Sequence, residues 1–387
     1  MREGWTYKKM SEVFDLQMGK TPDRKTPSYF GGNNVWVSIR DLDGKEIGES
    51  NEHITDTAVT TTNIRKVKKG TVIMSFKLTV GKCAICTKDL YTNEAIMAFN
   101  LKEGYDITPD FLYYYLSNYN WKGANKAVMG MTLNKATISQ QIISYPSLSE
   151  QQSIVAELDK INELISLKKA QLSDLDSLAQ SIFYDMFGDP IENEKGWEVK
   201  KLGEMCTCIT KGTTPTTLGF SFTDTGVNFV KVESFIDGQI NNAKLAHITN
   251  ECNMALSRSQ LQNKDLLICI AGATIGKMAV VDSSILPANT NQACAIVRLR
   301  NKNHLRFIRT FIAIKLKEDI IQMGKGVAQP NLSLGQLREF LISVPPLPLQ
   351  QEFAKRIKMI EQQKAQIGST IKDLETLLAS RMQYWFD

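Results

Sequence analysis

A glycine-rich hexapeptide in the second half of the chain comes nearest to a phosphate-binding loop. Gly272-Ala273-Thr274-Ile275-Gly276-Lys277 is one residue short of the Walker spacing, and Met278 stands where a Ser or Thr would hold Mg²⁺. A similar Thr79-Val80-Gly81-Lys82 occurs in the first half. We therefore expect a turn between strands here and no nucleotide chemistry.

Cysteine spacing raises the question of a metal site. Cys83 and Cys86 have a spacing that occurs in zinc sites. The matching positions of the second half hold Met278 and Val281, and an apolar strand face explains both halves. Cys206-x-Cys208 has no second pair with ligand spacing. We predict no metal site.

Other catalytic motifs were not found. The chain has no [Asn/Asp]-Pro-Pro-[Tyr/Phe] tetrapeptide, which argues against base methylation of that kind. No Ser-His-Asp or Cys-His constellation stands out, because the three histidines, His53, His247 and His304, are far apart in the sequence. The sequence predicts no catalytic residue and no cofactor of its own.

Composition places the chain among ordinary globular proteins. It has 387 residues, a formal net charge of +5, 43% hydrophobic and 22% charged residues, which suggests two or three folded domains. No apolar run approaches the ~20 residues of a membrane helix, and the N-terminus has no apolar signal region. Seven cysteines, an odd number, favour reduced thiols and a cytoplasmic location.

An internal duplication organises the elements that carry these residues. The order of the matching motifs is the same in both halves, at an offset that drifts from 192 to 199. The pairs are Gly4-Trp5-x-x-Lys8-Lys9 with Gly196-Trp197-x-x-Lys200-Lys201, Gly19-Lys20-Thr21-Pro22 with Gly212-Thr213-Thr214-Pro215, Asp43-Gly44 with Asp237-Gly238, Asn93-x-Ala95 with Asn291-x-Ala293, and Pro146-x-Leu148-x-x-Gln151-Gln152 with Pro345-x-Leu347-x-x-Gln350-Gln351.

Each copy consists of a mixed α/β block of about 150 residues and a tail of about 38. Apolar runs predict buried strands at 72–76 and 266–270, and 293–299 alternates like a further strand. Segments 111–119 and 305–316 are predicted helices.

The tails predict two long helices. Apolar residues recur at spacings of 4 and 3 over five heptads in both tails, which is typical of a coiled-coil seam. Ser149 is a candidate cap of the first helix, and Gly188 with Pro190 should end it. The predicted seam residues are Ile154, Leu158, Ile161, Ile165, Leu172, Leu175 and Ile182 in the first tail, and Phe353, Ile357, Ile360, Ile367, Ile371, Leu374 and Leu378 in the second.

Two features of the tails have alternative interpretations. The helices could pack on their own blocks, although a strict 3.5-residue stripe suits a helix partner better. Lys168 and Lys364 occupy seam positions. Each lysine could place its ammonium group in solvent while its alkyl chain packs on the seam, or it could disfavour other registers or orientations of the helix pair.

Chain geometry predicts how the helices pair. A helix over 152–187 would be about 54 Å long and would join the two blocks with few residues to spare. A second helix that pairs with it must run back, so the pair is antiparallel with an approximate two-fold axis. We predict an α+β protein in which a two-helix antiparallel coiled coil separates two similar blocks, divided as 1–148, 149–190, 191–347 and 348–387.

This plan resembles the specificity subunit of type I restriction–modification systems, over nearly the whole chain. The resemblance rests on the order, twice over, of the Gly-Trp-x-x-Lys-Lys opening, the Gly-x-Thr-Pro-like turn, Thr-[Val/Ile]-Gly-Lys, and Pro-x-Leu-x-x-Gln-Gln before a long helix. One departure is Lys77-Leu78-Thr79 where the second half has Gly272-Ala273-Thr274, so the first loop is bulkier.

The resemblance implies a non-catalytic DNA-recognition subunit. The blocks would be target recognition domains that read a bipartite asymmetric site, and the helices would be spacers. Partners would be double-stranded DNA, two modification (methyltransferase) subunits and the restriction (translocase/nuclease) subunits. S-adenosylmethionine, ATP and Mg²⁺ are expected on those partner subunits and not on this chain.

Candidate DNA contacts are the polar and basic residues beside the repeated turns, because phosphates attract Lys and Arg, and base edges pair with Arg, Lys, Asn and Gln. They are Lys20, Arg24, Lys25, Arg40 and Lys77 in the first half, and Lys211, Lys231, Arg258, Lys325, Gln329 and Asn331 in the second.

Two other function classes remain open from the residues alone. The chain could be a coiled-coil scaffold that carries two peptide- or receptor-binding modules. An enzyme with its own nuclease or transferase site is disfavoured by the missing motifs.

Overall fold

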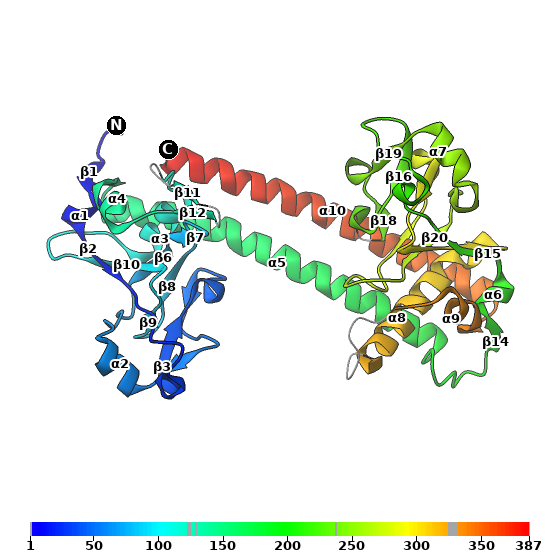
Figure 1. The fold of residues 1–387 in the computed structure, drawn as a ribbon, viewed down its shortest axis with the longest axis horizontal. Helices are drawn as coiled ribbons and strands as arrows, with labels where there is room; N and C mark the ends of the chain where they lie inside the picture. The colour runs from blue at the N-terminus through cyan, green and yellow to red at the C-terminus, as the bar shows by residue number, and fades with distance from the viewer. Residues whose placement is uncertain (1, 122–124, 128–129, 237, 324–330, 387) are drawn as a thin grey trace. The chain divides into compact units, whose positions relative to one another are not determined.

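The computed structural model describes residues 2–121, 125–127, 130–236, 238–323 and 331–386. The chain divides into two compact units: residues 1–169 together with 369–387, and residues 170–368. Each unit contains one α/β block and parts of two long helices (Figure 1).

A five-stranded sheet forms the centre of the first block, in the order β2-β10-β6-β8-β4. Neighbours are antiparallel except β4 and β8, which are parallel. All four residues of β6 are buried because both faces of the sheet are covered: Val72 and Met74 face one core cluster and Ile73 faces another. The strands are β2 (Phe14–Met18), β4 (Glu46–Ile47), β6 (Val72–Ser75), β8 (Cys83–Cys86) and β10 (Ile96–Leu101).

Smaller elements complete the first block. A three-stranded sheet β5-β3-β9 lies beside helix α2, and α3 packs on strands β6 and β8. Their bounds are β1 (Thr6–Lys9), α1 (Met10–Val13), β3 (Phe30–Val37), β5 (His53–Ile54), α2 (Asp56–Thr62), β7 (Lys77–Leu78), β9 (Tyr91–Thr92), α3 (Pro109–Asn118), β11 (Asn125–Ala127), β12 (Gly130–Thr132), α4 (Lys135–Gln140) and β13 (Ile142–Tyr145).

The second block repeats this topology. Its sheet order β15-β23-β20-β21 matches β2-β10-β6-β8, and β19-β16-β22 matches β5-β3-β9, with one antiparallel and one parallel pairing in each small sheet. The predicted strands and helices are confirmed, although α8 extends beyond 316. The bounds are β14 (Glu198–Lys201), α6 (Leu202–Met205), β15 (Cys206–Lys211), β16 (Val227–Val230), β17 (Phe235–Ile236), β18 (Gln239–Ile240), β19 (Ala246–Ile248), α7 (Asn250–Ala255), β20 (Leu266–Cys269), β21 (Met278–Val280), β22 (Ala288–Thr290), β23 (Cys294–Leu299), α8 (Leu305–Met323), α9 (Leu334–Glu339) and β24 (Leu341–Val344).

The two long helices are α5 (Leu148–Phe187) and α10 (Leu347–Phe386). The prediction that Ser149 caps α5 is wrong: Ser149 lies inside the helix, and the hydroxyl of Ser147 accepts the backbone N–H of Glu150. Gly188 ends α5 in the left-handed region at φ 78°, as predicted. Among the described residues, no helix has the length and apolarity needed to cross a membrane.

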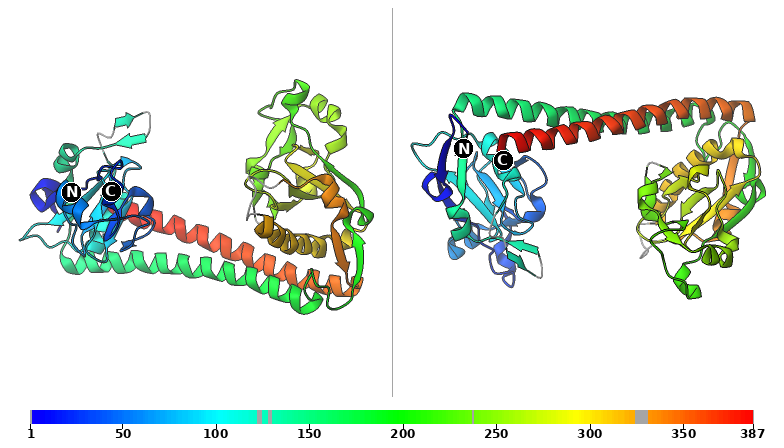
Figure 2. Two further views of the ribbon diagram at one scale, coloured as in Figure 1. Left: turned by 60° about the horizontal axis from the view of Figure 1, so that its bottom comes forward. Right: turned by 90° about the horizontal axis from the view of Figure 1, so that it is seen from above.

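Within each unit the two helices run antiparallel. In the first unit Glu157 binds Arg381 and Trp385, and further along α5 Lys169 pairs with Glu375 at 3.1 Å. In the second unit Asp176 pairs with Lys364 at 2.6 Å, so this seam lysine has an ion-pair partner. As α5 proceeds along the chain, its partners on α10 come from earlier positions of α10. Figure 2 shows both helices in each unit.

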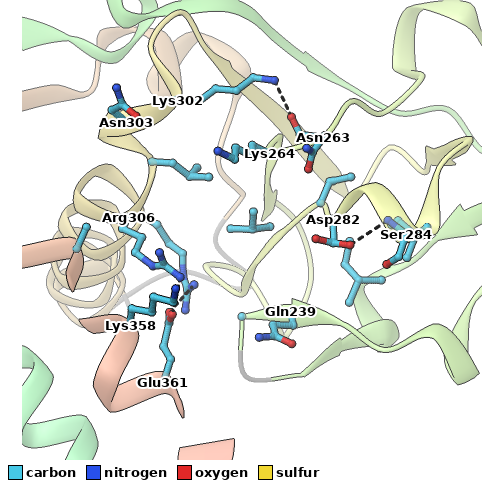
Figure 3. Close-up of a pocket in the computed structure, with 18 of the residues that line it drawn as sticks. Gln239, Asn263, Lys264, Asp282, Ser284, Lys302, Asn303, Arg306, Lys358 and Glu361 are labelled. Carbon is cyan, nitrogen blue, oxygen red and sulfur yellow. Dashed lines mark hydrogen bonds and ion pairs between the residues drawn. The ribbon is translucent and has the colours of Figure 1, made fainter. Parts of the chain in front are cut away.

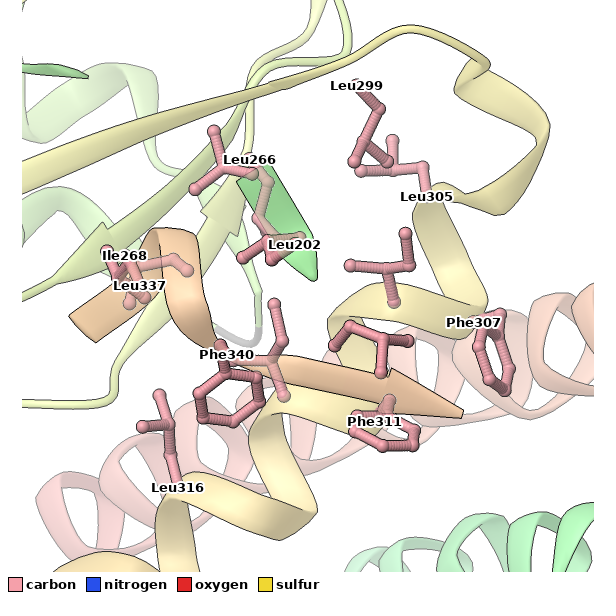
Figure 4. Packing of buried hydrophobic residues seen from close by; sticks show 14 of the residues in the cluster. Leu202, Leu266, Ile268, Leu299, Leu305, Phe307, Phe311, Leu316, Leu337 and Phe340 are labelled. Carbon is pink, nitrogen blue, oxygen red and sulfur yellow. The ribbon is translucent and has the colours of Figure 1, made fainter. Parts of the chain in front are cut away.

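Every predicted seam residue is buried or half-buried, whereas the most exposed leucines of the two helices, including Leu164, Leu167, Leu178 and Leu377, lie off the seam. The ends of the helices also pack on the blocks, an arrangement that the sequence interpretation disfavoured. Phe183 and Phe187 enter the core of the second block, where their rings contact Phe307 (Figure 4 shows this core). In the first block Phe386 of α10 packs against the core, where its ring contacts Phe111.

The repeated Gln-Gln pair anchors the start of each long helix. The fully buried Gln151 donates to the carbonyls of Asp106 and Pro146 and accepts the backbone N–H of Thr108 at 2.9 Å. The equally buried Gln350 donates to the Pro345 carbonyl at 2.7 Å and bonds the His304 ring. The motif therefore ties each helix to the loop that precedes α3 or α8.

Replacement of the anchoring glutamine should destabilise the first block. Gln151→Ala leaves two carbonyls and one N–H without a partner in a buried site, so we expect the free energy of unfolding to fall by at least about 2 kcal/mol. Urea denaturation of the full chain measures this loss. Gln152→Ala, at the exposed neighbouring position, is the matched control and should stay within about 0.5 kcal/mol of the parent. Equal effects of the two variants would contradict the anchoring role.

Candidate nucleic-acid interface

The Gly-x-Thr-Pro-like turn of each half meets the Asn-x-Ala turn of the same half. A Cβ on Gly19 would collide with the carbonyl oxygens of Thr92 and Asn93, and a Cβ on Gly212 would collide with those of Thr290 and Asn291. Only glycine allows this close approach of two backbones. The two motifs are thus halves of one structural unit that occurs in both copies.

Side chains reinforce the junction of the turns. Asn93 accepts the backbone N–H of Ala95 at 3.1 Å, and Asn291 accepts that of Ala293 at 3.2 Å. In the first half the Thr21 hydroxyl donates to Glu94, whereas in the second the Thr214 hydroxyl bonds to Gln292. The scaffold is the same, but the exposed polar group beside it is a carboxylate in one copy and an amide in the other.

An arginine is held in a fixed position beside the first turn. Arg24 makes a two-point ion pair with Glu52, at 2.5 and 2.8 Å, and its guanidinium lies 4.9 Å from the centre of the Trp36 ring. The indole N–H of Trp36 donates to the carbonyl of Lys20. The hydrogen bond to Arg24 lowers the pKa of Glu52, so both groups stay charged. The Trp36 side chain therefore contacts the backbone of Lys20 and the guanidinium of Arg24, while the Lys20 ammonium donates to the carbonyl of Thr62 at 2.6 Å.

The second turn also has basic neighbours. Arg258 donates to the Thr213 hydroxyl at 3.4 Å, and Lys211 is exposed at the end of β15, directly before the turn. Lys231 lies over the Phe222 ring, with 4.0 Å between its ammonium nitrogen and the ring centre. Arg258 and Lys211 thus flank the repeated turn.

The remaining candidates are more scattered. Lys25 and Arg40 are exposed in the first block, Lys77 begins β7 beside the ring of Phe76, and Asn331 is exposed before α9. Lys325 and Gln329 lie outside the described residues.

The Thr-[Val/Ile]-Gly-Lys segments connect two antiparallel strands, β6 with β8 and β20 with β21. A Walker loop joins a strand to a helix, so the predicted turn role agrees with the structure. The expected difference at the bulkier first loop is seen at Leu78, which is 56% exposed at a left-handed φ of 65° and pairs with β12. In the second half the left-handed residues of this loop are both glycines, Gly272 and Gly276.

The cysteines have the environment of structural thiols. Burial raises the pKa of the Cys83 thiol and of the Cys206 thiol to about 12, so both stay protonated. Within the described part of the chain, no three His, Cys, Asp or Glu side chains are grouped as a metal would require.

Sequence reasoning missed several residues that position these turns. It did not single out Glu52, Glu94 or Gln292, although the last two stand inside the repeated Asn-x-Ala motif. It also missed Phe183, because the heptad frame placed Ile182 on the seam. An alignment of the two halves would have pointed to Glu94 and Gln292, which occupy the same position of the repeated motif.

The duplicated topology, with one conserved junction of turns surrounded by different polar side chains, defines a two-module recognition protein. The model of the type I restriction modification DNA specificity domain matches residues 2–176 and again 194–376. The chain belongs to this family, as the sequence motifs predicted, and has two copies of the domain.

Relatives agree with this assignment. The chain is 27% identical to the type I restriction enzyme MjaIX specificity subunit of Methanocaldococcus jannaschii, over 93% of this chain and 88% of that protein. It is 23% identical to the EcoBI specificity subunit of Escherichia coli, over 71% of this chain and 63% of that protein. These relatives are named as specificity subunits, which confirms the prediction of a non-catalytic recognition component.

Two solved structures share the fold. One is a structure that describes complex assembly and conformational transition of the type I R-M system, with a TM-score of 0.65 and 18% identity over 100% of this chain and 98% of that one. The other is the S subunit from M. genitalium, with a TM-score of 0.52 and 14% identity over 99% of this chain and 96% of that one. Both confirm the duplicated α+β fold.

Leu78 provides a test of the strained first loop. A left-handed leucine costs about 1–2 kcal/mol, and its exposed side chain buries little apolar surface, so we expect Leu78→Gly to raise the free energy of unfolding by about 0.5–1 kcal/mol. Urea denaturation measures the change. Leu101→Gly, at an exposed strand position, is the control and should be destabilised by a similar amount. A destabilised Leu78→Gly variant would show that this backbone conformation is not strained.

Proposed function

We propose that the chain is the DNA sequence-recognition subunit of a type I restriction–modification complex and that each domain reads one half of a bipartite asymmetric site. The target recognition domains are 1–148 and 191–347, and the spacer helices are 149–190 and 348–387. The observation that carries the proposal is the repeated junction of turns, built twice on one scaffold and surrounded by unlike polar groups.

Asymmetry of the site follows from the differences between the copies. Lys20 of the first turn corresponds to Thr213 of the second, and Glu94 corresponds to Gln292. Amide, carboxylate and ammonium groups pair with different base edges in the major groove. Two modules with different groups at the same place would therefore read two different short sequences.

The long helices are proposed to fix the gap between the half-sites. Each has 40 residues and so a length of about 60 Å, and each pairs with its partner through buried apolar side chains and ion pairs. A rigid spacer of this kind sets a defined number of base pairs between the two sequences, since one DNA turn is ~34–36 Å.

Chemistry is assigned to the partner subunits. Two modification subunits with S-adenosylmethionine would methylate an adenine in each half-site after extruding it from the duplex, because a stacked base is out of reach. Restriction subunits with ATP and Mg²⁺ would translocate and cut the DNA, and the complex would work in the cytoplasm.

The complete complex should bind DNA in a sequence- and salt-dependent manner. If several phosphates are neutralised, the affinity for a duplex with the correct bipartite site should fall by at least about tenfold between 50 and 200 mM salt. Methylome sequencing of a host with and without the chain identifies the site, and gel shifts measure the affinity. A protein scaffold without DNA contacts would show no preferred bipartite sequence, which would overturn the proposal.

Single substitutions should weaken recognition of one DNA half-site without affecting the other. Arg24→Ala should weaken recognition of the first half-site by about 1–3 kcal/mol, and Arg258→Ala should do the same for the second, because each arginine lies beside a different turn. Gel shifts with duplexes altered in one half-site measure this selectivity. Arg356→Ala removes an exposed arginine of α10 that pairs with Glu352, outside the turns, and should leave binding unchanged. Identical losses at both half-sites from either variant would contradict separate reading.

A further inference from the structure

The second unit contains a pocket of about 1100 Å³ between the β17–β18 hairpin, the start of α8 and the first turns of α10. Figure 3 shows Lys264, Lys302, Arg306 and Lys358 around it, from different elements. Among the DNA-contact candidates that the structure describes, none lines this pocket. It is therefore a separate feature of the second half.

The pocket has a strong excess of positive charge. Six basic side chains line it against two acidic ones, Asp282 and Glu361: the six are Lys264, Lys302, Arg306, Arg309, Lys355 and Lys358. Glu361 forms ion pairs with Arg306 at 3.0 Å and with Arg309 at 3.3 Å. These three side chains together keep one net positive charge. Among the described residues no carboxylate pairs with Lys264, Lys355 or Lys358.

One of these lysines is held in an unfavourable backbone conformation. Lys264 has a left-handed φ of 67°, which costs a non-glycine residue about 1–2 kcal/mol. The equivalent residue of the first half is Gly70, at φ 80°. The backbone N–H of Gly70 donates to the carbonyl of Cys86, and the backbone N–H of Lys264 donates to the carbonyl of Val281, which is the residue equivalent to Cys86. The second half thus has a lysine at a position where the fold favours glycine.

The surrounding structure maintains this conformation. The fully buried Asp265 makes a two-point ion pair with Arg298, at 2.7 and 2.8 Å, and accepts the backbone N–H of Gln262. These bonds fix the turn from which the Lys264 side chain reaches the pocket (Figure 3). Strain that the surroundings maintain in this way is typical of functional positions.

The first half has the opposite charges at the same places. Lys302 corresponds to Asp106, Arg306 to Asp110 and Lys358 to Asp159, counted from the starts of the matching helices. There, Lys45 pairs with Asp110 and Asp159, each at 2.7 Å, and neutralises part of the acidic group. Because the scaffold is common, the basic character of the second pocket is a property of its side chains and not of the fold.

We propose that this pocket is a binding site for clustered phosphate groups, such as the polyphosphate of a nucleotide. Arginine forks and lysine ammonium groups both suit phosphate oxygens, and several cations converge on one concave space. A phosphate group presents three acceptor oxygens to surrounding cations, whereas a carboxylate presents two, so cations that converge on one space favour phosphates over an acidic peptide. Amide side chains of Asn241, Asn242, Asn263 and Asn303 line the same space and can bind the sugar or base. The inference goes beyond the proposed function and does not depend on it.

The test is calorimetric titration, in the absence of DNA, of the complex of the full-length chain and its modification subunits with sodium tripolyphosphate. The restriction subunits are left out because ATP is expected to bind to them. We expect saturable binding that weakens about tenfold or more in the double variant Lys302→Asp/Lys358→Asp, which copies the residues of the first half. Lys244→Asp/Lys372→Asp makes the same change of net charge at exposed positions outside the pocket and should bind like the parent. Thermal melting verifies that all variants are folded.

Competition identifies the source of the phosphates. Displacement of tripolyphosphate by ATP would identify a free nucleotide as the occupant and supports the phosphate site. Displacement only by a short duplex would assign these cations to DNA contact and would overturn the proposal. Absence of saturable binding, equal binding by the double variant, equal affinity for hexaglutamate, or failure of both competitors would overturn it. Sequence-specific DNA binding is measured separately, so its failure would leave this result interpretable.

Discussion

The core of each α/β block is closed by side chains from both long helices, and the rest of the structure depends on this packing. In the second unit the rings of Phe183 and Phe187 from α5 and Phe353 from α10 pack together against α8. In the first unit Ile154 and Leu158 of α5 lie in the same core that Phe386 of α10 covers. Burial of one such side chain stabilises the fold by about 1.5–3 kcal/mol. The ends of the long helices are therefore parts of the cores of the two blocks.

This constraint leaves the polar surface free to vary. Glycines at the turn junctions and buried glutamines at the helix starts keep the backbone in one course in both copies. Exposed positions on that backbone can then exchange a lysine for a threonine, or an aspartate for a lysine, with little effect on packing. This separation allows two domains to fold alike while their polar surfaces differ.

Much of the fold could be predicted because its signals are local. The heptad spacing identified both long helices, and apolar runs identified β6 and β20. The Gln-Gln motif was visible, but its role was not, since Gln151 acts on residues about 45 positions away. For the candidate site, the repeated turns were found, while the partners Glu52 and Glu94 were not, because each reaches its turn only through the folded chain.

The sequence by itself determined the duplication, the helical seam and the family, since periodicity and repeated motifs are properties of neighbouring residues and of their order. Only the tertiary structure decided which charges meet. Lys264, Lys302, Arg306 and Lys358 are separated by up to 94 positions, and they line one pocket because a turn, a helix start and a second helix converge there. The same convergence in the first half gathers aspartates around Lys45. Spatial proximity of distant residues is a consequence of packing, and no local pattern records it.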